Sequence, residues 1–185
     1  MEVKNFSIPD LKLIIPQKFE DNRGYFMEIY KKDFFEKNNV PIQWIQENLS
    51  CSSPLVLRGL HFQFNQPQAK LVTCLQGKIF DVAVDIRPHS PTYKQHISVM
   101  LDSSSPSFFY IPEGFAHGFL ALEGSPATVL YKVNAPYNPK GEGSIRWDDP
   151  DLKVQWPRQS NLIISPKDQK APYLKEISEK LESWF

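Results

Sequence analysis

The chain has 185 residues and a mass of 21.4 kDa, enough for a single domain, spanning residues 1–185, whose core needs no disulfide or metal. Its 21 Lys and Arg residues balance its 21 Asp and Glu residues, and a net charge of zero argues against a general nucleic-acid binder. No apolar run reaches membrane-spanning length, the N-terminus lacks a signal-peptide core, and Cys51 and Cys74 are too few for a disulfide framework, so we expect a cytoplasmic protein.

The first half of the chain predicts one short helix and a pair of strands. Residues 31–38 favour a helix that buries Phe34 or Phe35. Residues 70–87 predict two strands with a turn at Gln76-Gly77. In the second strand, one face carries Phe80, Val82, Val84 and Ile86, and the other carries Ile79, Asp81, Ala83 and Asp85.

The second half continues with short strands and closes with a helix. Residues 102–107 indicate a polar loop, and residues 108–111 an aromatic strand ended by Pro112. Residues 119–122 and 127–134 predict strands that flank a hairpin-type turn at 123–126. An apolar stripe predicts a C-terminal helix packed outside the sheet; it consists of Leu174, Ile177, Leu181 and Trp184. Many short strands at even spacing favour a sandwich or barrel.

Two of the four histidines fall in polar surroundings. His89 lies in a proline-rich turn, and His96 follows a polar stretch, so we expect both to be solvated. His61 lies in the probable strand Leu57-Arg-Gly-Leu-His-Phe-Gln63, where Arg58 adds a permanent cation suited to a phosphate. Strict alternation places Arg58 and His61 on opposite faces, so their joint use requires a bulge or twist near Gly59.

The remaining histidine lies in a turn-to-strand motif. His117 ends the pattern Pro-x-Gly-x-x-His within Ile111-Pro-Glu-Gly-Phe-Ala-His-Gly-Phe119, which is similar to the second motif of the cupin β-barrels. The first cupin motif would supply a His-x-His and a glutamate, but His61 is followed by Phe62 and Gln63. Two isolated histidines do not complete a site of three protein ligands, so we predict no catalytic metal and no cofactor.

Over almost its whole length the chain resembles the dTDP-4-dehydrorhamnose 3,5-epimerase family, cupin-fold enzymes of dTDP-L-rhamnose synthesis. The matching motifs include FEDNRGYFME at 19–28, LRGLHFQ at 57–63 and IPEGFAHGF at 111–119. Further matches, in the family's order, lie at 46–50, 68–72, 80–85, 90–93, 147–150 and 165–168. The resemblance implies an all-β, cupin-type jelly-roll barrel or sandwich with short peripheral helices.

The resemblance also implies a chemistry, because a C4 carbonyl acidifies the protons on C3 and C5 of a nucleotide-linked 4-keto-6-deoxyhexose. On that basis His61 is the base and Asp168 its carboxylate partner, which fixes the tautomer. Lys70 would stabilise the enolate oxygen, and Tyr131 would return a proton from the opposite face.

Nine further positions match substrate contacts of the family, whose substrate is dTDP-4-dehydro-6-deoxy-D-glucose. They are Arg23, Phe26, Glu28, Gln46, Asn48, Arg58, His117, Glu142 and Lys167. In the family, the N-terminal segment that contains Arg23 and Glu28 reaches the pocket of the partner subunit, so the resemblance implies a homodimer with shared sites.

Three other interpretations stay open at this point. A relative could invert only C3 or only C5, or act on another nucleotide-linked 4-keto sugar, and Tyr131 favours double epimerisation without proving it. A catalytically inactive cupin that binds a sugar nucleotide would be expected to lack His61, Lys70 or Tyr131, and all three are present. A metal-dependent cupin is the last alternative, and metal analysis would decide it.

Overall fold

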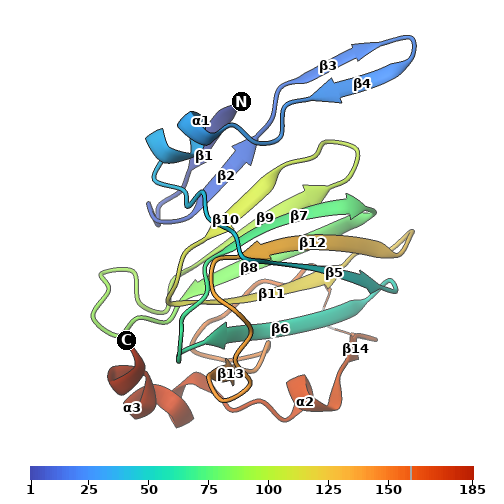
Figure 1. The fold of residues 1–185 in the computed structure, drawn as a ribbon. Coiled ribbons are helices and arrows are strands. Elements are labelled where there is room, and N and C mark those ends of the chain that lie inside the picture. Colours follow the sequence, from blue (N-terminus) through green and yellow to red (C-terminus); the bar gives the residue numbers. More distant parts are fainter. Residues whose placement is uncertain (159) are drawn as a thin grey trace.

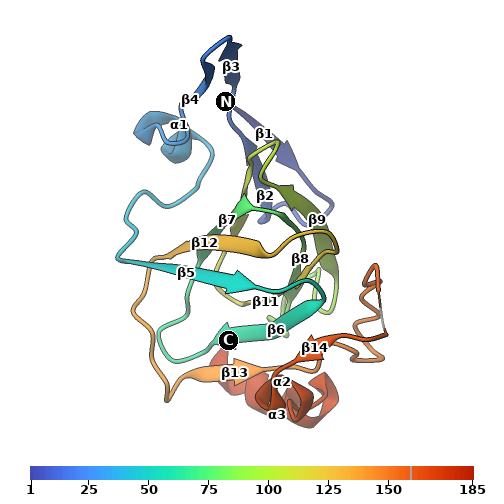
Figure 2. The ribbon, with the colours of Figure 1, turned by 90° about the vertical axis from the view of Figure 1, so that its right-hand side faces the viewer.

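The computed structural model describes residues 1–158 and 160–185 and contains two β-sheets packed face to face (Figures 1 and 2). The first sheet has the strand order β1-β2-β10-β7-β12-β5, and all its pairs are antiparallel. Its strands are β1 (Glu2–Asn5), β2 (Lys12–Ile15), β5 (Gln46–Ser52), β7 (Lys70–Gln76), β10 (Phe108–Ile111) and β12 (Ala127–Val133).

The second sheet has the order β13-β6-β11-β8-β9, with a short strand β14 beside β6 in the parallel direction. Its strands are β6 (Val56–Gln63), β8 (Lys78–Asp85), β9 (His96–Asp102), β11 (Phe115–Ala121), β13 (Glu142–Ser144) and β14 (Ile163–Ile164). The two sheets confirm the predicted all-β fold of jelly-roll type and the predicted strands on either side of Gln76-Gly77.

The main core fills the space between the sheets. Val72 and Val129 from the first sheet meet Ile79, Ala83 and Phe115 from the second, and each is at most 2% exposed. Alternation along β8 produces this packing, because one face of the strand points to this core while the other points outward, as its sequence predicts.

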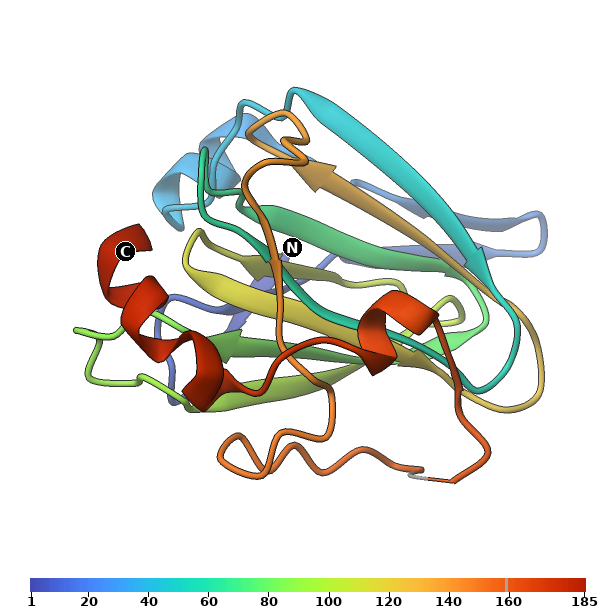
Figure 3. The ribbon, with the colours of Figure 1, turned by 90° about the horizontal axis from the view of Figure 1, so that it is seen from below.

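Helices cover the outer faces of both sheets. α1 (Lys32–Lys37) buries Phe35 against the first sheet, as predicted. α3 (Leu174–Trp184) lies across the outside of the second sheet (Figure 3) and buries its predicted apolar stripe there. At its end, the ring of Trp184 stacks on Phe64 at a centroid distance of 3.9 Å. None of the described helices has the length and apolar character needed to span a membrane.

The predicted hairpin at residues 123–126 is wrong. β11 starts at Phe115, earlier than expected, and pairs with β6 and β8, whereas β12 pairs with β5 and β7. The turn therefore carries the chain from the second sheet to the first instead of joining neighbours. Both strands place apolar residues in the core between the sheets, and this requires them to face each other across it.

A two-stranded hairpin projects away from the sandwich (Figure 1). It consists of β3 (Lys18–Asp21) and β4 (Gly24–Met27). Its aromatic side chains Phe19, Tyr25 and Phe26 are all more than half exposed. Three neighbouring aromatic rings in water are an unusual feature for the surface of a monomer and indicate a surface available for contact.

Candidate active site

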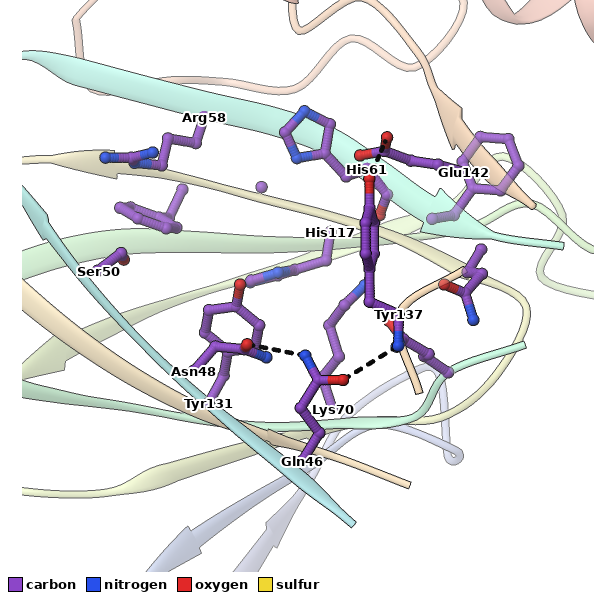
Figure 4. A pocket seen from close by; sticks show the side chains of 15 residues that line it. Gln46, Asn48, Ser50, Arg58, His61, Lys70, His117, Tyr131, Tyr137 and Glu142 are labelled. Atoms are coloured by element: carbon purple, nitrogen blue, oxygen red, sulfur yellow. Dashed lines mark hydrogen bonds between the residues drawn. The ribbon is translucent and has the colours of Figure 1, made fainter. Parts of the chain in front are cut away.

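A cavity of about 370 Å³ opens between the two sheets (Figure 4). Its walls come from β5, β6, β7, β11, β12 and β13 and from the loops that precede β7 and β13. The lining residues are Gln46, Asn48, Ser50, Arg58, His61, Phe62, Gln63, Gln68, Lys70, His117, Gly118, Phe119, Tyr131, Tyr137 and Glu142. Eight of the thirteen predicted site residues are among them.

A β-bulge brings Arg58 and His61 to the same cavity. In the pairing of β6 with β11, Phe119 lies opposite Arg58 and His117 lies opposite His61, so β6 advances three residues where β11 advances two. The irregular residue is Gly59, which has a φ of 111°. A Cβ at this position would lie 2.6 Å from the Cα of Gly118. The bulge predicted near Gly59 is confirmed.

The ring of His61 is bound to Asp168. The distance from His61 Nε2 to Asp168 Oδ1 is 2.6 Å, and the backbone N–H of Gly59 donates to the same carboxylate at 3.3 Å. Burial by itself raises the pKa of Asp168, but the hydrogen bonds from His61 and Gly59 outweigh it and lower the pKa. Because Nε2 is engaged, Nδ1 is the ring nitrogen left for a ligand.

A short helix, α2 (Pro166–Gln169), presents this carboxylate. Ser165 caps its N-terminus by accepting the N–H of Asp168 at 3.1 Å, and Pro166 occupies the first helical position. This helix is not among the predicted elements, although Ser-Pro-x-Asp is a recognisable helix start. The cap directs the Asp168 side chain inward, where it is 3% exposed.

Three buried polar groups lie next to each other on β7, β8 and β11. Lys70 on β7 is 8% exposed, and burial lowers its pKa to about 8, against the opposing effect of the Asp81 charge. Asp81 on β8 is fully buried, and its two oxygens lie 2.9 and 3.0 Å from Nε2 of His117 on β11. Burial raises the pKa of Asp81, while the nearby His117 and Lys70 lower it.

Tyr131 lies across the cavity from His61 (Figure 4). Tyr131 belongs to β12 of the first sheet, whereas His61 belongs to β6 of the second. Burial raises the pKa of the Tyr131 phenol, and the neighbouring Arg58 lowers it only in part. The phenol therefore keeps its proton at neutral pH. A ligand between the two walls would meet a nitrogen base on one side and a hydroxyl donor on the other.

Hydrogen bonds link five residues along the rim of the cavity. Gln46 donates its amide N–H to Asn48 at 2.9 Å and accepts the backbone N–H of Tyr137 at 3.0 Å. The Tyr137 hydroxyl donates to Glu142 at 3.0 Å, and Lys167 pairs with the same carboxylate at 2.6 Å. Lys167 is thus at the site although it does not line the cavity.

The structure does not bring Arg23, Phe26 and Glu28 to this cavity. Arg23 and Phe26 lie on the projecting hairpin, Glu28 follows it, and all three are exposed. The guanidinium of Arg23 is held by Asp21 of the same hairpin at 2.6 Å. Their predicted role depends on a partner subunit and stays a prediction.

Asp81 and Tyr137 are not among the site residues predicted from the sequence. A signal for Asp81 was present, because a carboxylate alternates with Ile79 and Ala83 on a face that must be buried. Tyr137 lies in the loop Asn134-Ala-Pro-Tyr-Asn-Pro139, which has no periodicity, so nothing indicated which way its side chain points.

The other two histidines lie outside the cavity. His89 is solvated as predicted, with its side chain 79% exposed and 3.2 Å from Glu182. His96 is partly buried, and burial lowers its pKa, so the prediction of a solvated side chain is wrong. Across the described residues, no three His, Cys, Asp or Glu side chains cluster in a way that would hold a metal ion.

Known proteins resemble this chain closely. The family model for dTDP-4-dehydrorhamnose 3,5-epimerase matches residues 5–176. An epimerase of that name from Methanothermobacter thermautotrophicus is 46% identical over 166 residues, 89% of either chain. Another, from Sinorhizobium fredii, is 41% identical over 96% of this chain and 91% of its own length. The solved dTDP-6-deoxy-D-glucose-3,5-epimerase of Legionella pneumophila, in complex with dTDP-4-keto-L-rhamnose, superposes with a TM-score of 0.92 at 42% identity, covering 97% of this chain and 96% of that one.

Proposed function

The chain belongs to the dTDP-4-dehydrorhamnose 3,5-epimerase family and is an isomerase of nucleotide-linked sugars; from this we propose that its cavity inverts C3 and C5 of dTDP-4-dehydro-6-deoxy-D-glucose. One observation carries the proposal: a base from one sheet and a proton donor from the other face the same cavity, and a buried ammonium lies beside them.

In the first step His61 removes a proton from C3 or C5. Its Nε2–H donates to Asp168, which leaves the lone pair of Nδ1 as the base and stabilises the imidazolium that forms. The C–H bond breaks, its proton moves to Nδ1, and its electron pair delocalises onto O4. No electrons leave the sugar, so the step needs no redox cofactor.

Lys70 stabilises the negative charge that develops on O4. Among the described residues, its ammonium makes one hydrogen bond, to the His61 carbonyl oxygen at 3.5 Å. Two N–H groups are therefore free to donate to an oxyanion. Because the group is 8% exposed, its charge acts in a poorly screened environment, where it stabilises an enolate more strongly than it would in water.

Tyr131 completes the inversion by giving a proton to the opposite face of the same carbon. The O–H bond breaks, a C–H bond forms, and the enolate returns to the ketone. His61 then loses its proton to solvent, which the 35% exposure of its side chain permits, and Tyr131 regains one. The second carbon is inverted by the same four residues once the sugar ring has shifted in the cavity. They are His61, Asp168, Lys70 and Tyr131.

The remaining predicted contacts hold the nucleotide-sugar. Arg58, His117, Gln46, Asn48 and Glu142 line the cavity. Lys167 lies beside Glu142 at the rim. We assign Arg23, Phe26 and Glu28 to the cavity of a partner subunit, which makes the active form a homodimer with shared sites. The exposed rings of the β3–β4 hairpin support this assignment, since burial against a partner would remove them from water.

Hydrogen exchange in deuterated water tests the assignment of the base. His61→Ala should abolish deuterium uptake at C3 and at C5, because the base contributes about 10² to 10⁴ in rate. Uptake is measured by NMR or mass spectrometry of the sugar, with dTDP binding as the control for an intact fold. Uptake that survives at either carbon would show that another base acts there.

Tyr131→Phe separates removal of a proton from inversion. The variant keeps His61 and Lys70, so exchange should persist while net inversion, trapped with a coupled reductase, falls. Loss of exchange in a folded, dTDP-binding variant would contradict the division of roles. In the unmodified chain, the number of exchanging carbons distinguishes double epimerisation from action at C3 or C5 alone.

A further inference from the structure

A buried carboxylate that the reaction above does not use lies within the site. Asp81 is in the middle of β8 and is fully buried. Both of its oxygens lie within 3.0 Å of Nε2 of His117. An unpaired carboxylate is costly to bury, so this one must be held by neighbouring hydrogen-bond donors and charges.

The charge of the Lys70 ammonium also acts on Asp81. The cross-strand neighbours of Lys70 are apolar, Ile111 on β10 and Val133 on β12. Tyr131, also on β12, lines the same cavity with a neutral phenol. On the second sheet, β6 contributes the His61 carbonyl and the imidazole bound to Asp168, and β11 contributes His117. Of the charges around Lys70, that of Asp81 is the one that favours the charged ammonium.

We propose that Asp81 is a positioning residue for this reaction, one that fixes the ring of His117 with Nδ1 as its ligand-facing nitrogen and keeps the Lys70 ammonium charged for the enolate. The proposal rests on the proposed function. It extends that function by giving the site a second His–Asp pair, on the strand next to the first, that never touches the reacting carbons.

The direction of the expected effect follows from the burial of Lys70. Burial lowers the pKa of Lys70 to about 8, and the Asp81 charge is the influence that holds it up. A neutral amide in place of that carboxylate leaves the ammonium uncompensated, so Lys70 should lose its proton at lower pH. Removal of a nearby opposite charge typically lowers the pKa of an ammonium by about one unit.

Asp81→Asn and Asp85→Asn form a matched pair for the test. Both carboxylates are fully buried on the same face of β8, but Asp85 binds Arg87, Ser90 and Thr92 away from the cavity. The Lys70 Nζ titration is followed by ¹⁵N NMR without substrate and assigned by its loss in Lys70→Arg. We expect the midpoint to fall about one pH unit in Asp81→Asn and to stay in place in Asp85→Asn. An unchanged midpoint in Asp81→Asn overturns the proposal.

The pH profile provides the matching kinetic result. At pH 6, Lys70 is charged in both proteins, so any loss of kcat in Asp81→Asn measures other effects of the substitution. At pH 8, less Lys70 is charged in the variant, so its kcat should fall about a further fivefold relative to the unmodified chain. A loss that is equal at both pH values indicates a structural role and overturns the proposal. The NMR titration needs no turnover, so it still decides if the proposed reaction is wrong.

One measurement does not require a variant to fold. In the ¹⁵N-histidine spectrum of the unmodified chain, neutral His117 should carry its proton on Nε2, bonded to Asp81, and none on Nδ1. A neutral ring protonated on Nδ1 overturns the proposal.

Discussion

Three of the side chains that face the cavity are held from behind by another residue. Asp168 binds the ring of His61, and Asp81 binds that of His117. Arg58 follows the same arrangement, since its Nε–H donates to Ser52 Oγ at 3.0 Å and one terminal nitrogen donates to the Cys51 carbonyl at 3.3 Å. The geometry offered to a ligand is therefore set by groups that a ligand does not touch.

Ser52→Ala should weaken substrate binding with little effect on turnover. The side chain is 2% exposed, and its hydroxyl orients Arg58, which we assign to ground-state contacts. A hydrogen bond to a charged group contributes about 1.5–3 kcal/mol, so KM should rise roughly tenfold or more while kcat stays nearly constant. Steady-state kinetics measure both, and Ser107→Ala, a buried serine outside the cavity, is the control. A fall in kcat with an unchanged KM would contradict a role of Ser52 in substrate binding.

Sequence motifs predicted which side chains would meet, and the family resemblance predicted Asp168 as the support of His61, but the support of His117 was not predicted. His61, Lys70 and Tyr131 converge as expected. The sequence does not indicate a role for Asp81, because the partner of a buried acidic residue is known only once the strand order is known. Without the family resemblance, Asp168 resembles a solvated charge beside Lys167, because a contact between residues 61 and 168 leaves no local pattern.

At the scale of elements, the bulge in β6 controls the site. It turns Arg58 and His61 to one side, and it depends on the close approach of Gly59 to Gly118. The sequence predicted this bulge, because strict alternation would place Arg58 and His61 on opposite faces of the strand although both are expected at one site. The hairpin at 123–126 could not be predicted correctly, because periodicity reports which face of a strand is buried and not which strand lies beside it.

Gly59→Ala should destabilise the fold and reduce activity together. Strain at a φ of 111° costs about 1–3 kcal/mol, and the added methyl group would meet backbone atoms of Gly118 at 2.6 Å. Gly124→Ala is the matched control, with a φ of 108° and no atom within 4 Å of the added Cβ. Urea unfolding and kcat/KM measure both effects. We expect the control to lose stability only, and equal kinetics for the two variants would contradict a role of the bulge in the site.

At the scale of the whole molecule, the β3–β4 hairpin is the feature that one chain alone leaves unexplained. It projects from the sandwich (Figure 1). Its aromatic rings are exposed, and its Arg23 does not line the cavity of its own chain. A partner subunit that receives the hairpin would account for both observations. The sequence predicted this association through the family resemblance, whereas no strand pattern specifies a contact between copies.

Mixing two inactive variants should restore activity if the sites are shared. Arg23→Ala impairs the hairpin and His61→Ala the cavity. A mixed dimer then pairs an intact cavity with an intact hairpin at one of its two sites, so random exchange of subunits gives about a quarter of full activity. The assay follows activity after the two variants are refolded together, and each variant refolded alone is the control. A mixture no more active than its components would show that each chain completes its own site.

The position of Asp168 in the chain has a consequence for protein synthesis. Every residue that lines the cavity lies between Gln46 and Glu142, but the carboxylate that binds the ring of His61 comes 26 residues later. At about 5–20 residues per second, a ribosome takes roughly one to five seconds to cover that interval. During translation the nascent chain therefore acquires the residues that line the cavity first, and the partner of the His61 ring last.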